Sequence, residues 1–361
     1  MAGSPIYVTS FKGLGVLTIR ELRQRLQVDR DQAITSTVRD YDITRFTVDN
    51  MDRLGSLRTT EDVFYELGLT DLTGQRDDEQ RVEDLVAAAP IEQAITCKRG
   101  LTPKAGSGRP TFRVIVQAED ATWRTYRRER LEEAAARAIS IRYRKWRRVE
   151  DDSHLEIWVH ILDRSALVGL RMTDRTMRHR DYKVANLPGS LRPTIAASAV
   201  LLSKPTDTDT FLDPSCGAGT ILLERALDRP HRMLLGGDIR KVAVTATLEN
   251  FGNKHRPWEI KTWDATSLPL DDASVTRVVT NPPWGHQTSA GRSLPEYYKQ
   301  SLREIERVLS PWGRAVLLTS EWRAMQESLK ICKALKIDER IRGISVMGRK
   351  ADLYSLIRTD I

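Results

Sequence analysis

Two patterns of apolar and polar positions divide the chain near its middle. Before that point, Phe112, Val114 and Val116 alternate with more polar positions as in a half-buried strand, and residues 155–161 repeat the alternation. From Leu191 onward, short apolar runs alternate with helical segments, which is typical of a parallel sheet wrapped by helices. The pattern predicts an α+β first part followed by an α/β domain.

Seven apolar runs of the second part are strand candidates. They are residues 211–213, 233–237, 260–263, 275–280, 315–319, 341–346 and 353–357. The turn-forming sequence Leu187-Pro188-Gly189 precedes all of them. We therefore expect a linker at 177–190 and a seven-stranded α/β domain at 191–361.

The first 176 residues separate into two predicted domains. Residues 1–70 contain an extended start, the amphipathic stretch 14–26 and two alternating segments, as in a small α+β unit. In residues 71–176, a helix with apolar positions such as Leu131 and Ile139 lies between the two alternating strands. Another face of this helix carries arginines, which are Arg127, Arg130, Arg137 and Arg144. This face is open to solvent or to a ligand.

Composition narrows the class of protein. The chain has 361 residues, of which 40% are hydrophobic and 29% charged, so it has enough apolar material for proper cores. Its longest apolar runs, such as 195–202, fall far short of the roughly 18 residues of a membrane span, and no signal-like segment opens the chain. Cys97, Cys216 and Cys332 are too far apart for a disulfide framework or a zinc site. We expect a cytoplasmic protein without a metal.

The positive charge is concentrated in one region. The net charge of the chain is +8, whereas residues 123–148 alone carry +7 and residues 171–183 carry +3, which leaves −2 for the remainder. Basicity confined to two segments indicates a surface that binds phosphates rather than a generally basic protein.

Acids follow three successive predicted strands of the second part. Asp213 ends the first strand and precedes a turn with Gly217 and Gly219, where the backbone can approach a ligand. Asp238 ends the second strand and suits a ribose, and Asp264 follows the third and suits an adenine amino group. Alone, the glycine turn is equally compatible with an ordinary strand-to-helix turn, and each acid with a helix cap or a turn residue. Together they indicate a ligand that contains adenosine.

The fourth strand ends in Asn281-Pro282-Pro283-Trp284. Two prolines fix the backbone, so the asparagine amide and a neighbouring carbonyl are held in one orientation. Such a pair of acceptors binds both hydrogens of an exocyclic amine and directs its nitrogen at an electrophile, while Trp284 stacks on the base. An isolated tetrapeptide of this kind is also compatible with a plain turn, but its place after the acids favours catalysis.

These motifs resemble a known family. Asp-Pro-Ser-Cys-Gly-Ala-Gly at 213–219 and Asn-Pro-Pro-Trp at 281–284 look like the class I S-adenosylmethionine-dependent methyltransferases that modify exocyclic or amide nitrogens. Upstream, the strands, the basic helix and the run 177–183 resemble a THUMP domain, and residues 1–70 its usual ferredoxin-like companion. This order is similar to that of the tRNA guanosine-N2 methyltransferases of the acceptor stem and of THUMP-containing ribosomal RNA enzymes.

The resemblance implies a fold. We expect an α/β protein whose C-terminal seven-stranded Rossmann-like methyltransferase domain follows α+β ferredoxin-like and THUMP domains. Two positions depart from the family pattern: Trp284 stands where relatives often have Tyr or Phe, and Asp181 where they usually have Gly. The aromatic exchange preserves stacking, whereas Asp181 adds a negative charge to the basic run.

The resemblance also implies S-adenosyl-L-methionine as cofactor and assigns the residues that bind it. For the methionine and ribose end these are Asp213, Pro214, Gly217 and Gly219; for the ribose Asp238; for the adenine Asp264 and Ala265; and for the carboxylate Arg192 and Thr194. Asn281, Pro282, Pro283 and Trp284 receive the target base. The expected RNA-binding residues are Arg127, Arg130, Arg137, Arg144, Arg178 and Arg180.

By this resemblance, the chain transfers a methyl group to N2 of a guanosine in tRNA, with guanosine-6 of the acceptor stem as the expected target, and acts as a monomer. A ribosomal RNA guanosine is an alternative target. A second alternative is an adenine-N6 methyltransferase, because the same tetrapeptide would orient the N6 amine of adenine. A non-catalytic tRNA-binding protein is a third, against which the intact Asp213, Asp238, Asp264 and Asn281 stand.

Overall fold

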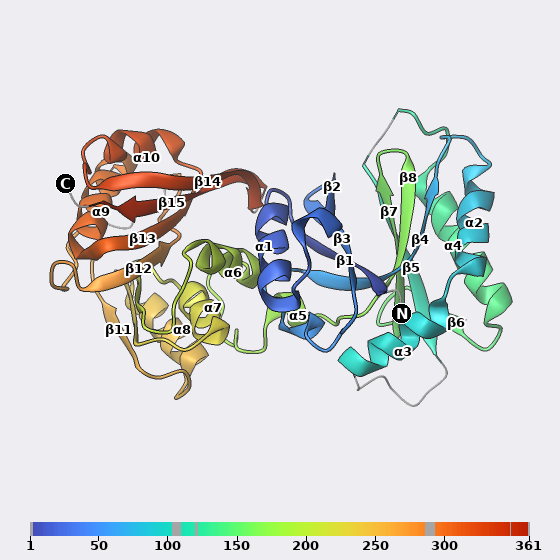
Figure 1. Cartoon of the computed structure of the whole chain (residues 1–361), viewed down its shortest axis with the longest axis horizontal. Coiled ribbons are helices and arrows are strands. Elements are labelled where there is room, and N and C mark those ends of the chain that lie inside the picture. The colour runs from blue at the N-terminus through green and yellow to red at the C-terminus, as the bar shows by residue number, and fades with distance from the viewer. Residues whose placement is uncertain (1–2, 103–109, 120–121, 286–292, 347, 360–361) are drawn as a thin grey trace. The chain divides into compact units, whose positions relative to one another are not determined.

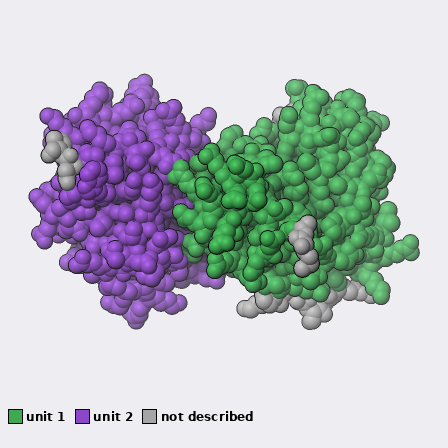
Figure 2. All heavy atoms as spheres, viewed as in Figure 1, with its two compact units in different colours: residues 1–177 green, residues 178–361 purple. Residues whose placement is uncertain are grey.

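The computed structural model describes residues 3–102, 110–119, 122–285, 293–346 and 348–359. The chain forms two compact units, residues 1–177 and 178–361, coloured separately in Figure 2. The break falls at the start of the predicted linker. Each unit contains its own sheet and its own buried core.

The first unit is built on an eight-stranded sheet of order β2-β3-β1-β4-β8-β7-β5-β6. Its strands are β1 (Ser4–Phe11), β2 (Ile34–Val38), β3 (Tyr41–Val48), β4 (Asp62–Asp71), β5 (Thr111–Gln117), β6 (Arg147–Arg148), β7 (Leu155–Leu162) and β8 (Ser165–Arg171). Strand β4 pairs with β1 on one side and with β8 on the other, so one sheet runs across the boundary expected at residue 70. A division of this unit into two domains stays a prediction.

Helices cover the apolar face of this sheet. They are α1 (Gly15–Leu26), α2 (Asp78–Ala88), α3 (Ile91–Leu101) and α4 (Arg128–Arg142), with short 3-10 turns at Arg30–Gln32 and Leu54–Ser56. Leu131 and Ile139 of α4 enter the core beside Phe112 and Ile157, as the helical period predicts. Helices α2 and α4 lie side by side (Figure 1), and Arg130 and Arg137 of α4 form ion pairs with Glu79 and Glu83 of α2. The short helix α5 (Thr176–His179) joins the two units.

The second unit contains a seven-stranded sheet of order β11-β10-β9-β12-β13-β15-β14. Its strands are β9 (Thr210–Asp213), β10 (Met233–Asp238), β11 (Trp258–Thr262), β12 (Val275–Thr280), β13 (Leu309–Thr319), β14 (Leu335–Val346) and β15 (Arg349–Arg358). The first five are parallel, whereas β15 runs antiparallel to both β13 and β14. All seven predicted strands are present, several of them longer than the apolar pattern indicates.

Helices cover both faces of this sheet (Figure 1). On one face lie α6 (Pro193–Leu202), α7 (Thr220–Asp228) and α8 (Lys241–Phe251), and on the other α9 (Leu294–Val308) and α10 (Trp322–Leu329). The core under α9 and α10 includes Leu212, Val278, Leu302 and Met325. Among the described residues, every helix is too short or too polar to span a bilayer.

Candidate active site

The predicted site residues meet at one edge of the second sheet. Because β10, β9 and β12 are neighbouring parallel strands, Asp238, Asp213 and Asn281 lie at adjacent carboxyl ends. Asp264 follows β11, the next strand on the outer side. In open α/β sheets, ligands bind at this edge where the strand order reverses, which is here between β9 and β12.

The glycine turn after β9 packs against helix α8. Gly217 and Gly219 both have positive φ, at +56° and +76°, a conformation that suits glycine. A Cβ on Gly219 would lie 2.7 Å from Cγ2 of Thr247, whereas the space above Gly217 is open. Thr247 Oγ1 donates to the Gly217 carbonyl at 2.8 Å. One glycine therefore allows close packing on the helix, and the other leaves room for a ligand.

A second side chain of α8, Asn250, ties this turn to the predicted linker. Its Nδ2 donates to the carbonyls of Ala218 and Ala185, both at 2.9 Å, and its Oδ1 accepts from the Ala185 backbone N–H at 2.8 Å. Asn250 is 7% exposed, so these hydrogen bonds are shielded from water. The position of residues 217–218 thus depends on a segment more than thirty residues upstream.

Asp213 is almost fully buried at the end of β9. Burial raises the pKa of its carboxyl to about 7, against the lowering effect of the hydrogen bond from the Ser215 backbone N–H. The negative charge of Asp238 raises the pKa further. A cationic ligand group beside Asp213 would favour the ionised carboxylate.

Asp238 is fixed by hydrogen bonds on both of its oxygens. Oδ2 accepts from the Gly217 backbone N–H at 3.1 Å, and Oδ1 accepts from the Arg240 backbone N–H at 3.0 Å. Arg240 Nε also reaches Oδ1 at 3.3 Å. The carboxylate therefore connects the glycine turn with the start of α8, where ribose hydroxyls are expected.

The segment after β11 supplies the outer wall of the site. Asp264 Oδ1 accepts from the backbone N–H and the hydroxyl of Thr266, at 2.9 and 2.7 Å. Ala265 is buried, and the Trp263 indole Nε1 donates to the Pro214 carbonyl at 3.1 Å. These contacts tie the third strand end to the glycine turn, although Asp264 itself engages its own local turn.

Arg192 and Thr194 occupy the start of α6. Arg192 is the exposed N-cap residue, and Pro193 takes the first helical position, where a missing N–H costs nothing. Thr194 is fully buried, and its carbonyl accepts from the Ser198 hydroxyl. Their contact with a cofactor carboxylate stays a prediction.

The Asn281–Trp284 loop is supported from below by β13 and α9. Tyr298 is fully buried; its hydroxyl lies 2.6 Å from the Thr319 hydroxyl and donates to the Pro283 carbonyl at 3.4 Å. The Trp284 indole Nε1 donates to the Leu318 carbonyl at 3.2 Å, which fixes the ring. Pro282 itself is buried.

Asn281 differs from the other site residues in the state of its acceptor. Oδ1 of Asn281 is buried and has no hydrogen-bond partner among the described residues. An unsatisfied buried acceptor costs about 1–3 kcal/mol and usually marks a position that a ligand or water completes. The atom expected to bind the target amine is thus one that the described part of the fold leaves unpaired.

Several supporting residues were missed by sequence reasoning. They are Thr247, Asn250, Tyr297 and Tyr298, whose hydroxyl or amide groups hold the glycine turn, Ser215 and the Asn281–Trp284 loop. Burial raises the pKa of Tyr297 to about 12, so its hydroxyl stays protonated beside Ser215. The spacing of Thr247 and Asn250 on one helix face was the available signal, but their partners are distant in sequence.

The predicted RNA-binding arginines of α4 are partly paired with acids of the neighbouring α2. Arg137 Nη2 lies 2.9 Å from Glu83 Oε2, and Arg130 Nη1 lies 3.4 Å from Glu79 Oε1. Arg127 and Arg144 are exposed and form no ion pair among the described residues. The sequence indicates a uniform arginine surface, but in the structure acids of α2 neutralise the positive charge over part of its length.

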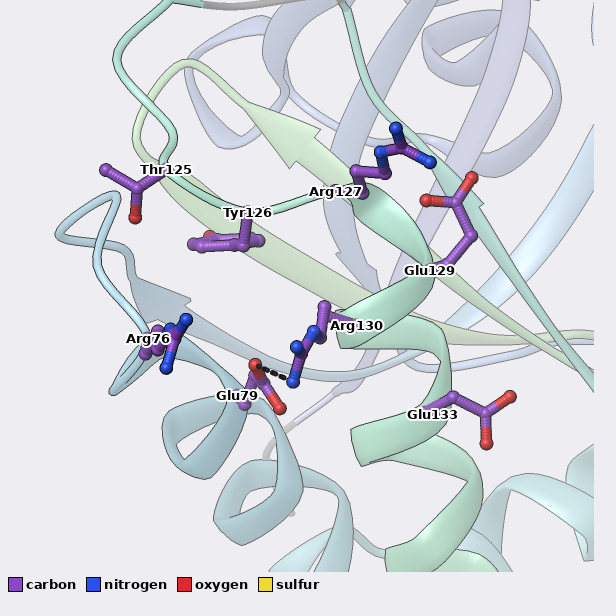
Figure 3. Close-up of a pocket in the computed structure, with 8 residues that line it drawn as sticks. All are labelled: Arg76, Glu79, Thr125, Tyr126, Arg127, Glu129, Arg130 and Glu133. Atoms are coloured by element: carbon purple, nitrogen blue, oxygen red, sulfur yellow. Dashed lines mark hydrogen bonds and ion pairs between the residues drawn. The ribbon is translucent and has the colours of Figure 1, made fainter.

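A hollow of about 440 Å³ lies where α2 and α4 begin (Figure 3). Its charged lining residues are Arg76, Arg127, Arg130, Glu79, Glu129 and Glu133. Because both signs of charge are equally represented, this hollow is not a simple phosphate cradle. It lies in the first unit and is not part of the strand-edge site.

Arg180 belongs to the second unit and faces its interior. Its Nε lies 3.3 Å from Oε1 of Glu224, a buried residue of α7, and the Tyr182 hydroxyl donates to the same oxygen at 2.6 Å. The Arg180 side chain is only 10% exposed. Arg178 is half-buried nearby. Their expected contact with RNA stays a prediction, and for Arg180 the structure offers a structural role instead.

The comparison with known families agrees with this geometry. Residues 180–345 match the model of a family described as RMKL-like, methyltransferase domain. These residues form a methyltransferase domain. Its strand order, with the antiparallel β15 between β13 and β14, is that of the class I fold that uses S-adenosylmethionine.

Curated relatives of the chain carry guanine-N2 methyltransferase names. The mouse tRNA (guanine(6)-N(2))-methyltransferase THUMP3 is 29% identical over 231 residues, which cover 60% of this chain and 46% of that protein. The bovine U6 snRNA (guanine-N(2))-methyltransferase THUMPD2 is 30% identical over 217 residues, 58% of this chain and 41% of that protein. The chain thus spans less than half the length of these relatives.

A solved structure resembles the chain over almost its whole length. The crystal structure of TrmN from Thermus thermophilus has a TM-score of 0.80, with 98% of this chain and 99% of that chain covered. At 21% sequence identity, this likeness shows a shared fold. The methyltransferase domain and the unit that precedes it therefore both have a counterpart in that structure.

The strand edge of the methyltransferase domain fits an adenosine-containing cofactor. The space above Gly217 is open, Asp213 is buried, and Asp238 is oriented by the Gly217 N–H, all at the carboxyl ends of strands next to the one that the Asn281–Trp284 loop follows. Among the described residues, no group of three or more His, Cys, Asp or Glu side chains is arranged to hold a metal ion.

Proposed function

We propose that the chain is an S-adenosyl-L-methionine-dependent RNA methyltransferase that modifies the N2 amine of a guanosine in tRNA, with guanosine-6 of the acceptor stem as the target. Asn281 Oδ1 supports transfer to an exocyclic amine, because it is a buried acceptor next to the cofactor edge with no partner among the described residues. The choice of guanine N2 is taken from the names of the relatives. The position is taken from the names of the relatives.

Bound S-adenosyl-L-methionine supplies an electrophilic methyl group on its sulfonium. The chain contributes binding and orientation: Asp213, with the turn from Pro214 to Gly219, holds the methionine and ribose end, and Asp238 holds the ribose. Asp264 and Ala265 would border the adenine, and Arg192 and Thr194 would hold the carboxylate. No separate base is needed, because the amine loses its proton readily once it is methylated.

Asn281 and the carbonyl of Pro282 accept the two hydrogens of the guanine amine. This geometry directs the nitrogen at the methyl group and excludes water from the line of attack. The half-buried Trp284, held by its indole hydrogen bond to Leu318, presents a fixed ring on which the base stacks. Stacking of this kind contributes about 1–3 kcal/mol per base, which partly offsets the cost of extruding a nucleotide from a duplex.

The RNA partner is supported by the relatives and by the location of charge. Both named relatives methylate guanine N2 in RNA, one in tRNA and one in U6 snRNA. The arginines Arg127, Arg144 and their neighbours supply affinity that does not depend on sequence. We also propose that the chain acts as a monomer, in the cytoplasm and without a metal ion.

Single-turnover transfer to an unmodified tRNA transcript tests the proposed function. Nucleoside mass spectrometry should find N2-methylguanosine, and inosine at the target position, which lacks the amine, should abolish transfer. Transcripts of ribosomal RNA and U6 snRNA fragments serve as competing substrates. N6-methyladenosine as product would replace the guanosine assignment with the adenine one, and cofactor binding without transfer to any of these RNAs would favour a non-catalytic role.

A further inference from the structure

The hairpin of β14 and β15 extends beyond the carboxyl edge of the methyltransferase sheet. Strand β13 ends at Thr319, which pairs with Asp352 of β15. The hairpin continues past this level, because Ser345 pairs with Lys350 and Val346 with Arg349. A register shift between Ile341 and Ile344 accompanies the extension, and such bulges bend and twist a strand pair. The tip of the hairpin is therefore outside the sheet, on the side of the candidate active site (Figure 1).

Arg349 at this tip lies directly over the end of the Asn281–Trp284 loop. Its Nη1 is 3.2 Å from the position that a Cβ on Gly285 would occupy, and Nη2 is 3.9 Å away. Gly285 has a φ of +66°, and its backbone N–H donates to Glu321 Oε1 at 2.9 Å. Glycine thus allows the guanidinium to approach the backbone one residue after Trp284, where a larger residue would press on it.

The charges of the hairpin differ between its body and its tip. In the body, Arg340 makes two hydrogen bonds to Asp352, and Arg314 of β13 pairs with Asp338. At the tip, Arg342, Arg349 and Lys350 are exposed and have no ion pair with a carboxylate among the described residues. Glu321, the N-cap residue of α10, accepts a hydrogen bond from the Gly285 N–H through Oε1 and forms no ion pair with Arg349 among the described residues.

We propose that Arg349, on a hairpin tip that also carries Arg342 and Lys350, binds a backbone phosphate of the RNA next to the target nucleotide. This inference rests on the proposed function and identifies the part of the RNA substrate, a backbone phosphate, that the hairpin binds. A guanidinium matches a phosphate with two parallel hydrogen bonds, and cations that no described acid neutralises retain their full charge for this contact. A nucleotide whose base reaches Trp284 carries its own phosphates past the loop end that Arg349 covers.

Arg349 acts here as a positioning residue. It touches the loop that receives the base and not the reacting atoms, so its contribution is to fix where the RNA backbone enters. A solvated hairpin tip with no ligand is the competing explanation. That explanation predicts that charge reversal at the tip affects RNA binding no more than charge reversal at the other end of the hairpin.

Charge reversal at the two ends of the same hairpin separates these explanations. Arg349→Glu and Lys350→Glu alter the tip, and Lys336→Glu makes an equal change at the exposed start of β14, where Lys336 pairs with Ile357 at the far edge. Binding of the full chain to an unmodified tRNA transcript is measured over a range of salt concentrations. Calorimetry with S-adenosylhomocysteine and thermal melting of each variant report the cofactor site and the fold.

Each tip variant should weaken tRNA binding roughly tenfold and reduce the slope of log K against log salt by about 0.7–0.9 for each phosphate that the variant no longer binds. Lys336→Glu should leave both values near those of the unaltered chain. Arg349→Lys should restore part of the affinity, because the charge returns without the two-pronged geometry. Affinity for S-adenosylhomocysteine should be the same in all variants.

Unchanged tRNA binding in both folded tip variants would overturn the phosphate site, and so would an equal loss in Lys336→Glu. These outcomes are distinct from failure of the proposed function, which is read from methyl transfer by the unaltered chain. A chain that binds tRNA through its tip but transfers no methyl group would keep this site and lose the proposed activity.

Discussion

The strand edge of the methyltransferase domain and the arginine face of α4 both carry predicted functional residues, but the fold treats them differently. At the strand edge, Asp238 is buried and fixed by several hydrogen bonds, and so is Asn250 of α8, which supports the glycine turn. On α4, Arg130 and Arg137 have side chains that are 59% and 48% exposed and pair with acids of α2. Buried hydrogen-bonded groups lose much when altered, whereas exposed ion pairs contribute about 0–1 kcal/mol. We therefore expect large single-residue effects at the edge and small ones on the helix.

The largest effect should come from Asn281→Ala. Loss of an oriented acceptor for the amine should lower the single-turnover rate by roughly 10² to 10³, the order found when one preorganised transition-state hydrogen bond is removed. Affinity for the cofactor should be nearly unchanged, because Asn281 Oδ1 has no partner on the cofactor turn. Rapid-quench transfer assays and calorimetry give the two values. Parallel losses of rate and cofactor affinity would mean that Asn281 has a structural role.

Asp213→Asn should weaken S-adenosylhomocysteine binding by about 10- to 100-fold, as expected for loss of a charged hydrogen-bonding group. The carboxyl of Asp213 has a pKa of about 7 through burial, so below pH 7 it is mostly protonated in the free chain. A cationic ligand favours the ionised form, and affinity should therefore rise from pH 6 to pH 8. Calorimetry at several pH values measures this dependence, which the Asn variant should lack.

The same substitution should stabilise the free chain. The folded pKa of Asp213 lies above the unfolded value of 3.8, so the unfolded state releases this proton first as the pH rises. Stability is consequently lost from about pH 4 to pH 7, and Asp213→Asn should raise the Tm at pH 8 but not at pH 4. A lower Tm at pH 8 would contradict the raised pKa.

An intermediate effect is expected for Asn250→Ala. The change leaves the Ala218 carbonyl and the Ala185 backbone without the amide that joins them, so affinity for S-adenosylhomocysteine should fall roughly three- to tenfold. Asn253→Ala, in the exposed turn after α8, is the matched control. Equal cofactor affinity in the Asn250 and Asn253 variants would show that the hydrogen bonds between the linker and the glycine turn do not contribute to cofactor binding.

The smallest effects should come from arginines of the α4 face, and tRNA affinity should fall more for an arginine without an ion pair than for a paired one. Arg127→Gln removes a charge that has no ion pair among the described residues, so tRNA affinity should fall about threefold with a salt slope reduced by about 0.7–0.9. Arg137→Gln should change affinity less than twofold, because Glu83 already compensates its charge. Filter binding over a salt series compares them. A larger loss for Arg137 than for Arg127 would reverse the ranking.

The strand-edge site could be predicted because its signals are local. Asp213 and Asp238 each end a strand and Asn281 directly follows one, and parallel strands bring their carboxyl ends to one edge. Their supports could not be predicted in the same way. Tyr298 contacts Thr319 and Pro283, and Asn250 contacts Ala185 and Ala218, and nothing in the chain near these residues specifies such partners.

The sequence alone determined the order of elements, the acids after the strands and the place of the double proline, because each depends on residues close together in the chain. Tertiary structure decided which charges remain available. It set Glu79 and Glu83 against the α4 arginines, buried Arg180 on Glu224, and left Arg349 beside Gly285 with no acid paired to it in the described ranges. A count of charge along the chain does not contain this information, because ion pairing depends on distances in space between segments that packing brings together.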